Sequence, residues 1–346
     1  MSKNCCCSDD SSCCASAKAR AVAVSTKLSE KDILGAWKVR FDIGRMNYKV
    51  EPGLYAVGKP DSDSPVFVSA NYKLTFDTLR KNLAGMDCRL LILDTYGINV
   101  WCAAGKGTFG TDEIIERISQ TGLSEIVTHR NLILPQLGAS GVIAHEVKQQ
   151  TGFNIIYGPV RAADIKAFIS SGYKSTAEMR TVNFTLRDRL VLTPVEFIEA
   201  AKKSLLVFGV LFLVNLFANR PFGLYDVTAY AGAVFMGTVL TPILLPLIPG
   251  KAFSWKGWLT GAIWTAIALW IFGWYSAGSW LLAAGYLLLL PAVSAYLALN
   301  FTGSSTYTSP SGVLKEMKAA LPLIIGSAAA GAILILIQTF FVGRPA

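Results

Sequence analysis

One cysteine, Cys102, lies at the change from a strand-like to a helix-like stretch of the sequence. The apolar run 90–93 and the turn 94–97 precede it. In an open α/β sheet, ligands bind beyond the carboxyl ends of the strands, which is where this order of segments puts the thiol. A thiol near the amino end of a helix ionises more readily, and the thiolate is the form that binds metals. The next three residues are small enough for a large flat ligand to approach the helix: Ala103, Ala104 and Gly105.

Residue type alone leaves more than one interpretation open for Cys102 and for its neighbours Asn99 and Trp101. A single cysteine in an apolar domain is more often a small buried hydrophobe than a ligand. Asn99 either caps the helix or hydrogen-bonds the sulfur of Cys102. Trp101 is interpreted as core packing.

Two other kinds of chemistry are excluded or weakly indicated. Gly105-Lys106-Gly107-Thr108 is not a phosphate loop, because Val100 stands where the required first glycine would be and Gly107 follows the lysine. The only histidines, His129 and His145, belong to no recognisable catalytic set. We place His129 after a strand 125–127, on the ligand side of the sheet.

The other cysteines concentrate at the amino terminus. Of seven cysteines, Cys88 joins Cys102 in the folded part, and the rest stand within the first fourteen residues: Cys5, Cys6, Cys7, Cys13 and Cys14. No secretory signal is recognised before them, so we expect reduced thiols in the cytosol. Their spacing fits no standard zinc site, which leaves a tail that scavenges soft metal ions and an ordinary terminus both open.

Composition indicates two regions. The 346 residues are 52% hydrophobic and only 16% charged, with a formal net charge of +9. The basic residues are scattered and form no stripe with stacking aromatics, so nucleic-acid binding is not expected. Acidic residues nearly vanish after about residue 204, and the apolar runs there exceed the roughly 20 residues that span a bilayer.

Short apolar runs alternate with helical patterns between residues 40 and 175. We expect strands at 54–57, 66–68, 90–93, 125–127 and 154–157. Expected helices start at the caps Thr75 and Thr111 and end at Gly85 and Gly122, and two more cover 142–150 and 162–170. This alternation predicts a mainly parallel, Rossmann-like α/β sheet covered on both faces.

The predicted domain organisation has four parts. Residues 1–35 form a disordered tail, 40–175 the α/β domain, 176–203 a connector with a hairpin near 179–192 and a helix from Pro194, and 204–346 an all-α membrane domain. The five transmembrane helices are expected at 204–219, 227–249, 257–275, 279–300 and 320–342. Basic residues flank mainly one side, which puts the α/β domain in the cytoplasm and the carboxyl terminus outside the inner membrane. Ser327 and Gly331, four residues apart, are predicted to allow close packing between helices. Prolines 242, 246, 291 and 322 predict kinks or helix ends. A role as a membrane anchor is favoured over transport, because the predicted segments lack ionisable residues.

The sequence around Cys102 resembles the cap-helix motif of the HgcA family, membrane-bound corrinoid proteins of microbial mercury methylation. The resemblance extends from residues 93–98 before Asn99–Lys106 to 107–113 after it, and to 128–130, 133–138 and 157–161. The plan of one α/β domain and five membrane helices is also similar.

The resemblance implies a corrinoid, a cobalamin-type cofactor, bound as in the corrinoid iron-sulfur protein, with Cys102 as the lower axial cobalt ligand. The implied activity is a corrinoid-dependent methyltransferase that moves a methyl group from methyl-cobalt(III) to Hg(II). A ferredoxin with two [4Fe-4S] clusters (HgcB-like) would reduce the cobalt, and a methyl-folate-dependent donor would supply the methyl group. Membrane lipid is expected as a further partner.

The predicted site combines the Cys102 helix with the ends of other strands. The cofactor-binding residues are Ser69, Asn71, Thr95, Gly97, Asn99, Val100, Trp101, Cys102, Ala103, Ala104, Gly105, Lys106, Thr128, His129, Gly158, Pro159 and Val160. Two alternative functions are kept: a membrane-anchored corrinoid methyl carrier of one-carbon metabolism, and a non-catalytic, thiol-rich metal-binding membrane scaffold.

Overall fold

The structure, a computed structural model, describes residues 21–219, 221–274, 279–304 and 310–342. The chain divides into two compact units. The sheet unit contains the described residues up to Ala36 and then Gly44–Thr181. The helical unit contains Trp37–Ile43 and the described residues from Val182 onward. The amino-terminal cysteines lie outside the described residues.

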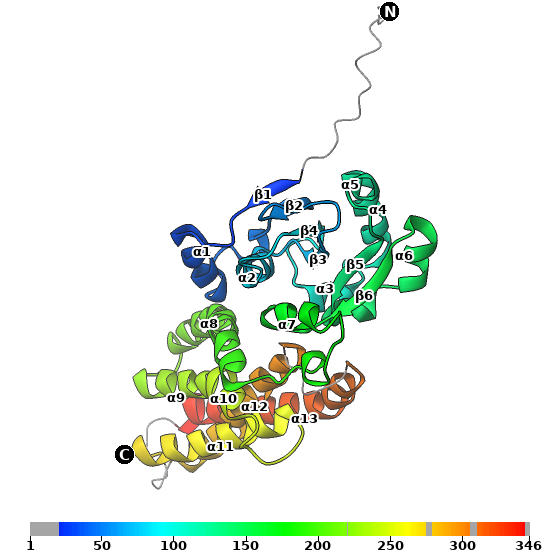
Figure 1. Cartoon of the computed structure of the whole chain (residues 1–346). Coiled ribbons are helices and arrows are strands. Elements are labelled where there is room, and N and C mark those ends of the chain that lie inside the picture. The colour runs from blue at the N-terminus through cyan, green and yellow to red at the C-terminus, as the bar shows by residue number, and fades with distance from the viewer. Residues whose placement is uncertain (1–20, 220, 275–278, 305–309, 343–346) are drawn as a thin grey trace, which may run out of the picture. The chain divides into compact units, whose positions relative to one another are not determined.

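A six-stranded sheet forms the centre of the sheet unit, in the order β1-β2-β4-β3-β5-β6 (Figure 1). Its strands are β1 (Val22–Val24), β2 (Gly53–Val57), β3 (Val66–Ala70), β4 (Cys88–Leu93), β5 (Asn131–Pro135) and β6 (Asn154–Gly158). The pairs β4-β3, β3-β5 and β5-β6 are parallel, as is β1-β2. The β2-β4 pair is antiparallel, so the mainly parallel sheet is confirmed but the sheet is mixed.

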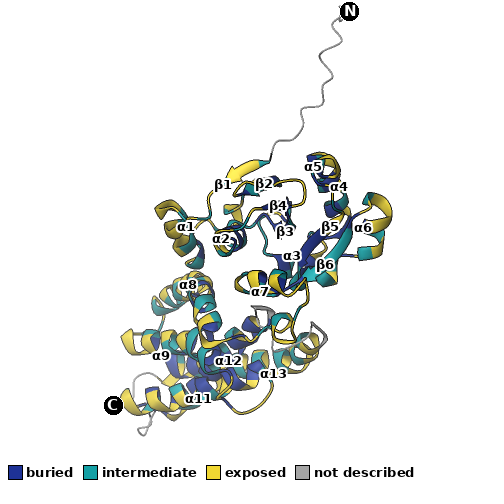
Figure 2. Cartoon of the chain, in the orientation of Figure 1, coloured by how far each residue is buried: buried dark blue, intermediate teal, exposed yellow. Residues whose placement is uncertain are grey.

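Alternating side chains of the central strands bury both faces of the sheet, as the dark strands of Figure 2 show. Leu91 and Leu93 of β4 enter one apolar cluster, and Leu90 and Ile92 enter the other. The first cluster includes residues of α3 (Val100–Lys106), α4 (Thr111–Thr121), α5 (Leu123–Ile126) and α6 (Ala144–Thr151). The second includes residues of α2 (Lys73–Asn82) and α7 (Ile165–Ser170). Helices therefore cover both faces, as predicted.

The strand predicted at 125–127 is wrong. Gly122 adopts a left-handed conformation that ends α4, and the chain then makes the short helix α5. The true strand, β5, starts at Asn131 and pairs with both β3 and β6. Tertiary pairing selects the second of two neighbouring apolar runs, which local pattern alone does not distinguish.

The predicted amino-terminal caps are also displaced. Tyr72 precedes α2 and Gly110 precedes α4, so Thr75 and Thr111 lie inside the helices. The helix end at Gly122 is confirmed. The helix predicted at 162–170 begins as a 3-10 turn, Ala162–Asp164, and continues as α7.

The prediction of disorder is wrong for residues 21–35, the part of the expected tail that the structure describes. Val22 of β1 pairs with Tyr55 of β2, and α1 (Glu30–Arg40) follows. Asp32 of α1 forms ion pairs with Lys73 and Arg80 of α2. Long-range pairing therefore orders a segment whose composition predicts disorder.

The connector contains a single long helix in place of the predicted hairpin. Thr185 and Asp188 form a reciprocal capping box at the start of α8 (Leu186–Asn215), and Pro194 lies in its interior. The rest of the helical unit consists of α9 (Leu224–Phe235), a π-helical turn (Met236–Leu240), α10 (Thr241–Leu244), α11 (Phe253–Ile271), α12 (Trp280–Asn300) and α13 (Pro310–Ile337).

Three described helical segments, rather than five, are long and apolar enough to cross a membrane: Leu224–Leu244, Trp280–Asn300 and Gly312–Val342. The apolar part of α8 follows the charged residues Lys202 and Lys203 and is therefore short. Helix α11 contains Lys256 together with Trp, Thr and Gly residues, which lower its hydropathy. The predicted packing motif is confirmed, because Ser327 donates a hydrogen bond to the Leu288 carbonyl at 2.8 Å. A Cβ added to Gly331 would lie 2.6 Å from the carbonyl oxygen of Gly285.

Candidate functional site

Four parallel strands end at one edge of the sheet, which we call the carboxyl rim. It comprises the residues that follow the neighbouring strands β4, β3, β5 and β6. Of the predicted site residues, Ser69 and Asn71 reach this rim from β3, Thr95 and Gly97 from β4, and Gly158 and Pro159 from β6. The parallel register thus gathers residues that are distant in sequence.

Asn71 joins the ends of β3 and β4. Its buried Oδ1 accepts hydrogen bonds from the Thr95 amide at 3.2 Å, the Thr95 hydroxyl at 2.9 Å and the Gly97 amide at 3.0 Å. Its Nδ2 donates to Asp94 Oδ1 at 2.9 Å. Asp94 in turn accepts from the Tyr96 amide at 3.0 Å. The turn before the Cys102 helix is therefore held by side chains as well as by its own backbone.

Cys102 is half-buried in the first turn of α3. Asn99 is the cap of this helix, because its Oδ1 accepts a hydrogen bond from the Cys102 amide at 2.9 Å. Trp101 is half-buried and Val100 is buried. The helix ends at Gly107 in a left-handed conformation, so Gly105-Lys106-Gly107 closes a helix instead of opening one as a phosphate loop does.

Only one of the three small residues is exposed. Ala103 and Ala104 are buried in the apolar cluster that α3 shares with α4, α5 and α6, so their side chains are not exposed to a flat ligand. Gly105 is exposed, and a Cβ added there would meet nothing within 4 Å. Residues three apart share a helix face, so Cys102 and Gly105 lie one above the other. The accessible face of α3 is formed by Cys102, Gly105 and the exposed Lys106.

The second described cysteine has a different environment. Cys88, at the start of β4, is fully buried. Burial, with a smaller contribution from the charge of Asp87, raises the pKa of its thiol to about 12. Cys88 is therefore a packed, neutral thiol, whereas Cys102 is accessible at the rim.

Thr128 and His129 do not lie at the carboxyl rim. They precede β5, and their side chains contact the segment that precedes β3: Thr128 Oγ1 donates to the Ser62 carbonyl at 3.3 Å, and His129 Nε2 lies 2.9 Å from the Ser64 carbonyl. This is the amino-terminal edge of the parallel strands. The misplaced strand at 125–127 explains why the prediction assigned them to the wrong edge.

The carboxyl rim contains residues that the sequence did not single out. The 3-10 segment Gln136–Gly141 follows β5 and packs against α3, where a Cβ added to Gly141 would lie 3.0 Å from the Cα of Ala104. Tyr96 is 65% exposed and has a left-handed backbone with φ of 56°. In the sequence, Gly138 and Gly141 are the signals for the 3-10 segment, and the pair Tyr96-Gly97 is the signal for the turn with left-handed backbone. The amide of Val160, another predicted site residue, donates a hydrogen bond to the Met179 carbonyl at 2.8 Å.

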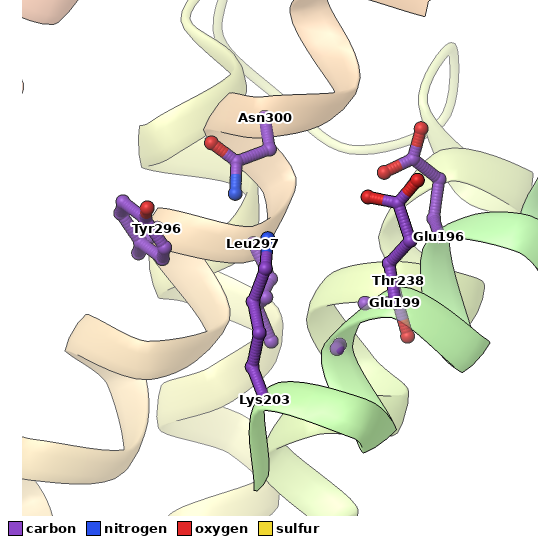
Figure 3. A pocket seen from close by; sticks show the side chains of 8 residues that line it. Glu196, Glu199, Lys203, Thr238, Tyr296, Leu297 and Asn300 are labelled. Atoms are coloured by element: carbon purple, nitrogen blue, oxygen red, sulfur yellow. The ribbon is translucent and has the colours of Figure 1, made fainter. Parts of the chain in front are cut away.

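A cavity of about 270 Å³ lies elsewhere, within the helical unit (Figure 3). It is lined by Glu196, Glu199, Ala200, Lys203, Thr238, Tyr296, Leu297 and Asn300. None of the predicted site residues lines it. Within the described ranges, no group of three or more His, Cys, Asp or Glu residues could hold a metal ion.

Comparison with known proteins identifies relatives of the sheet unit. Residues 28–169 match the family described as CO dehydrogenase/acetyl-CoA synthase delta subunit. The gamma subunit of the acetyl-CoA decarbonylase/synthase complex of Methanopyrus kandleri is 34% identical over 123 residues, 35% of this chain and 26% of that protein. The corresponding Archaeoglobus fulgidus subunit is 30% identical over 157 residues, 44% of this chain and 33% of that protein. The chain thus spans about a quarter to a third of the length of these relatives.

These matches correct the family expected from the sequence. The assignment to the HgcA family is wrong, because the matching family and relatives belong to the CO dehydrogenase and acetyl-CoA decarbonylase/synthase group. Mercury methylation, with Hg(II) as substrate, has no support among them. The matched residues contain the carboxyl rim and α3, so the sheet unit is similar to one part of a subunit of an acetyl-CoA decarbonylase/synthase complex.

Proposed function

We propose that the sheet unit binds a corrinoid at the carboxyl rim and serves as a methyl carrier in one-carbon metabolism. The matched family binds a corrinoid, which agrees with the cofactor expected from the sequence. The observation that carries the proposal is that Cys102 and Gly105 share the open face of α3 within the matched segment.

The residues of the rim fit such a cofactor. Gly105 leaves space for a flat ring to approach α3, and a side chain at this position would occupy that space. Cys102 provides a soft sulfur donor on the same face. Exposed Tyr96, in the turn that precedes α3, offers an aromatic surface at the same rim. A bound corrinoid would supply a cobalt centre that accepts and releases a methyl group.

The residues of this chain have positioning roles in the proposal. Asn99 fixes the first turn of α3 and thereby the position of the Cys102 side chain. Asn71 fixes the preceding turn through the Thr95 and Gly97 amides. Ala103 and Ala104 secure the helix to the core. The buried face of α3 therefore holds the accessible face in place.

The experiment is the anaerobic purification of the full chain in detergent, with cobalt analysis and absorption and EPR spectra. We expect bound corrinoid in the wild type, an altered cobalt spectrum in Cys102→Ala, and loss of bound cobalt in Gly105→Leu. Cys88→Ala is the matched thiol control and should keep the wild-type spectrum. Absence of cobalt from the reconstituted wild type would overturn the proposal, and identical spectra of wild type and Cys102→Ala would remove Cys102 as the ligand.

We further propose that the helical unit is embedded in the cytoplasmic membrane, with the sheet unit on the cytoplasmic side. Three apolar helical segments of sufficient length support this placement. Lys202 and Lys203 precede the first of these segments, and Lys315 and Lys318 lie in the first two turns of the last one, on the side assigned to the cytoplasm. The relatives are named as subunits of a complex, so the carrier would exchange its methyl group with other proteins. A ferredoxin electron donor and a methyl-folate-dependent donor remain predictions.

A further inference from the structure

Helix α1 exposes an apolar face. With about 100° of rotation per residue, Ile33, Leu34 and Trp37 of α1, and Phe41 in the turn that directly follows it, fall within an arc of about 100°, interrupted only by Glu30 in the first turn. All four side chains are exposed, Trp37 to 61%. The rings of Trp37 and Phe41 stack with their centroids 6.5 Å apart. A surface helix normally turns such a face toward the core, so this face requires another partner.

The opposite face of α1 packs against neighbouring residues of the chain. Val39 is buried, and Gly35 lies against the ring of Tyr48, where an added Cβ would be 2.5 Å from the hydroxyl oxygen. Asp32 forms ion pairs with Lys73 and Arg80. The helix therefore already has a packed face, and the exposed apolar face is a second one.

Basic residues lie beside the apolar arc. On the same helical wheel, the exposed Lys31 and Lys38 lie just beyond one edge of the arc. Long basic side chains at the edges of an apolar face can place their charges among lipid headgroups while the face enters the acyl boundary. This arrangement is complementary to an anionic lipid surface.

Within the helical unit, the segment Trp37–Ile43 contacts α8 at a specific point. Asp42 adopts a left-handed conformation after the helix, and the Ile43 amide bonds back to the Lys38 carbonyl at 2.9 Å. Asp42 Oδ2 forms an ion pair with Lys202 Nζ at 2.6 Å. Lys202 stands just before the exposed apolar residues Leu205 and Leu206 of α8. Trp37–Ile43 is thus fixed where α8 changes from polar to apolar.

We propose that the apolar face of α1, together with Ile43, is an interfacial anchor that lies in the headgroup region of a bilayer. The proposal goes beyond corrinoid binding and rests on the membrane placement of the helical unit. The full chain in nanodiscs that contain phosphatidylglycerol tests it. The fluorescence of Trp37 is obtained as the difference between the wild type and Trp37→Phe. Its quenching is measured with two reagents: lipids brominated on the upper part of the acyl chains, and acrylamide in the aqueous phase.

We expect brominated lipid to quench the Trp37 signal about twofold and acrylamide to quench it weakly. Difference signals from Trp280→Phe and Trp101→Phe are the references for a tryptophan at the end of an apolar helix and for one in the sheet unit. If brominated lipid quenched Trp280 but not Trp37, the interfacial anchor would be overturned while the membrane placement of the helical unit would stand, and the apolar face of α1 would be indicated to bind a protein partner. Failure to quench Trp280 would overturn the membrane placement and the anchor with it.

Two further variants test the face itself. Ile33→Asp should reduce brominated-lipid quenching of Trp37 about twofold, because the charge opposes burial of the face. Lys27→Gln changes the net charge equally outside the face and should leave the quenching unchanged. Phe41→Trp in the Trp37→Phe background moves the probe by one turn and should restore quenching. Equal responses of the Ile33 and Lys27 variants, or equal quenching of Trp37 and Trp101, would overturn the proposal.

Discussion

Asn71 is the residue on which the carboxyl rim most depends. A buried amide side chain can accept and donate at once, and this one satisfies two backbone amides, one hydroxyl and one carboxylate. An aspartate could accept the same bonds but could not donate to Asp94, and an aliphatic residue could do neither. The amide is therefore the side chain best suited to join the ends of β3 and β4.

Replacement of Asn71 by alanine should destabilise the sheet unit by about 3 kcal/mol, because the buried amide and hydroxyl of Thr95 and the half-buried amide of Gly97 lose their acceptor. Urea unfolding of the full chain in detergent measures the change. Asn82→Ala is the matched control, since the Asn82 amide donates to the Thr78 carbonyl at an exposed position. The control should change the stability by less than about 0.5 kcal/mol. Equal effects of the two substitutions would contradict the role assigned to Asn71.

Sequence reasoning found the main residues of the rim but not their orientation. Cys102, Asn71 and Thr95 follow apolar strand-like runs, and that pattern is visible without a structure. The burial of Ala103 and Ala104 depends on how a seven-residue helix is rotated against the sheet. So short a helix has too few turns for its apolar period to reveal that rotation.

At the scale of elements, α1 and α2 are joined by a compact ionic network. Asp32 contacts Lys73 at 2.5 Å and Arg80 at 2.8 Å, and Asp77 contacts both cations. Burial by itself would raise the pKa of Asp32, but hydrogen bonds from Lys73, Ser29 and Arg80 outweigh it and hold this pKa well below its usual range. The ionised form of Asp32 is therefore bound more strongly in the folded state.

This network predicts how stability depends on pH. A carboxyl whose pKa is lowered on folding stabilises the protein above its unfolded pKa of about 4, and the stabilisation disappears as the pH falls through the folded value. Asp32→Asn should be less stable than wild type by about 2 kcal/mol at neutral pH. The difference should shrink steadily below about pH 4.

Chemical denaturation between pH 7 and about pH 2 measures this difference. Asp112→Asn is a suitable control, since Asp112 is exposed in the first turn of α4 and makes no ion pair within the described part of the chain. A wild-type advantage that stays constant down to the lowest pH would contradict the assignment to Asp32.

The elements show why sequence placed one strand wrongly. Residues 125–127 contain the β-branched pair Ile126-Val127, residues 132–134 are entirely apolar, and a strand at either position suits the alternation of strands and helices. Only β5 has partners on both sides, Leu132 facing Val66 on β3 and Ile155 on β6. Neither partner is close in sequence. The error then carried Thr128 and His129 to the wrong edge of the sheet.

At the scale of the whole molecule, two units with separate cores share one chain. The apolar clusters of the sheet unit contain none of the residues of the clusters in the helical unit. The division was visible in the sequence as the change in composition near residue 204. The number of spanning helices could not be predicted from the sequence. The apolar stretches of α8 and α11 were counted as spans, but they are too short or too low in hydropathy to cross a membrane.

Separate cores predict separate responses to mutation. Gly331→Leu should destabilise the helical unit by about 2 kcal/mol, because the added side chain would collide with the α12 backbone at Gly285. Gly326→Leu lies on the same helix with nothing within 4 Å of an added Cβ, and it should be nearly neutral. Thermal unfolding in detergent, with the Trp101 signal reporting on the sheet unit, should show a lowered helical transition and an unchanged sheet transition. A shift of both transitions would contradict two independently stable units.

The turn before α3 has a consequence for the entropy of ligand binding. Three successive amides, those of Thr95, Tyr96 and Gly97, donate to only two side chains, Asn71 and Asp94. Ordering the backbone of one flexible residue costs about 1–2 kcal/mol of free energy. A flexible turn of three residues that became ordered on binding would therefore weaken the free energy of ligand binding by about 3–6 kcal/mol. Here that ordering is completed when the sheet folds. A ligand that reaches the rim meets a surface that is already rigid, and the free energy of its contacts is expressed largely as affinity.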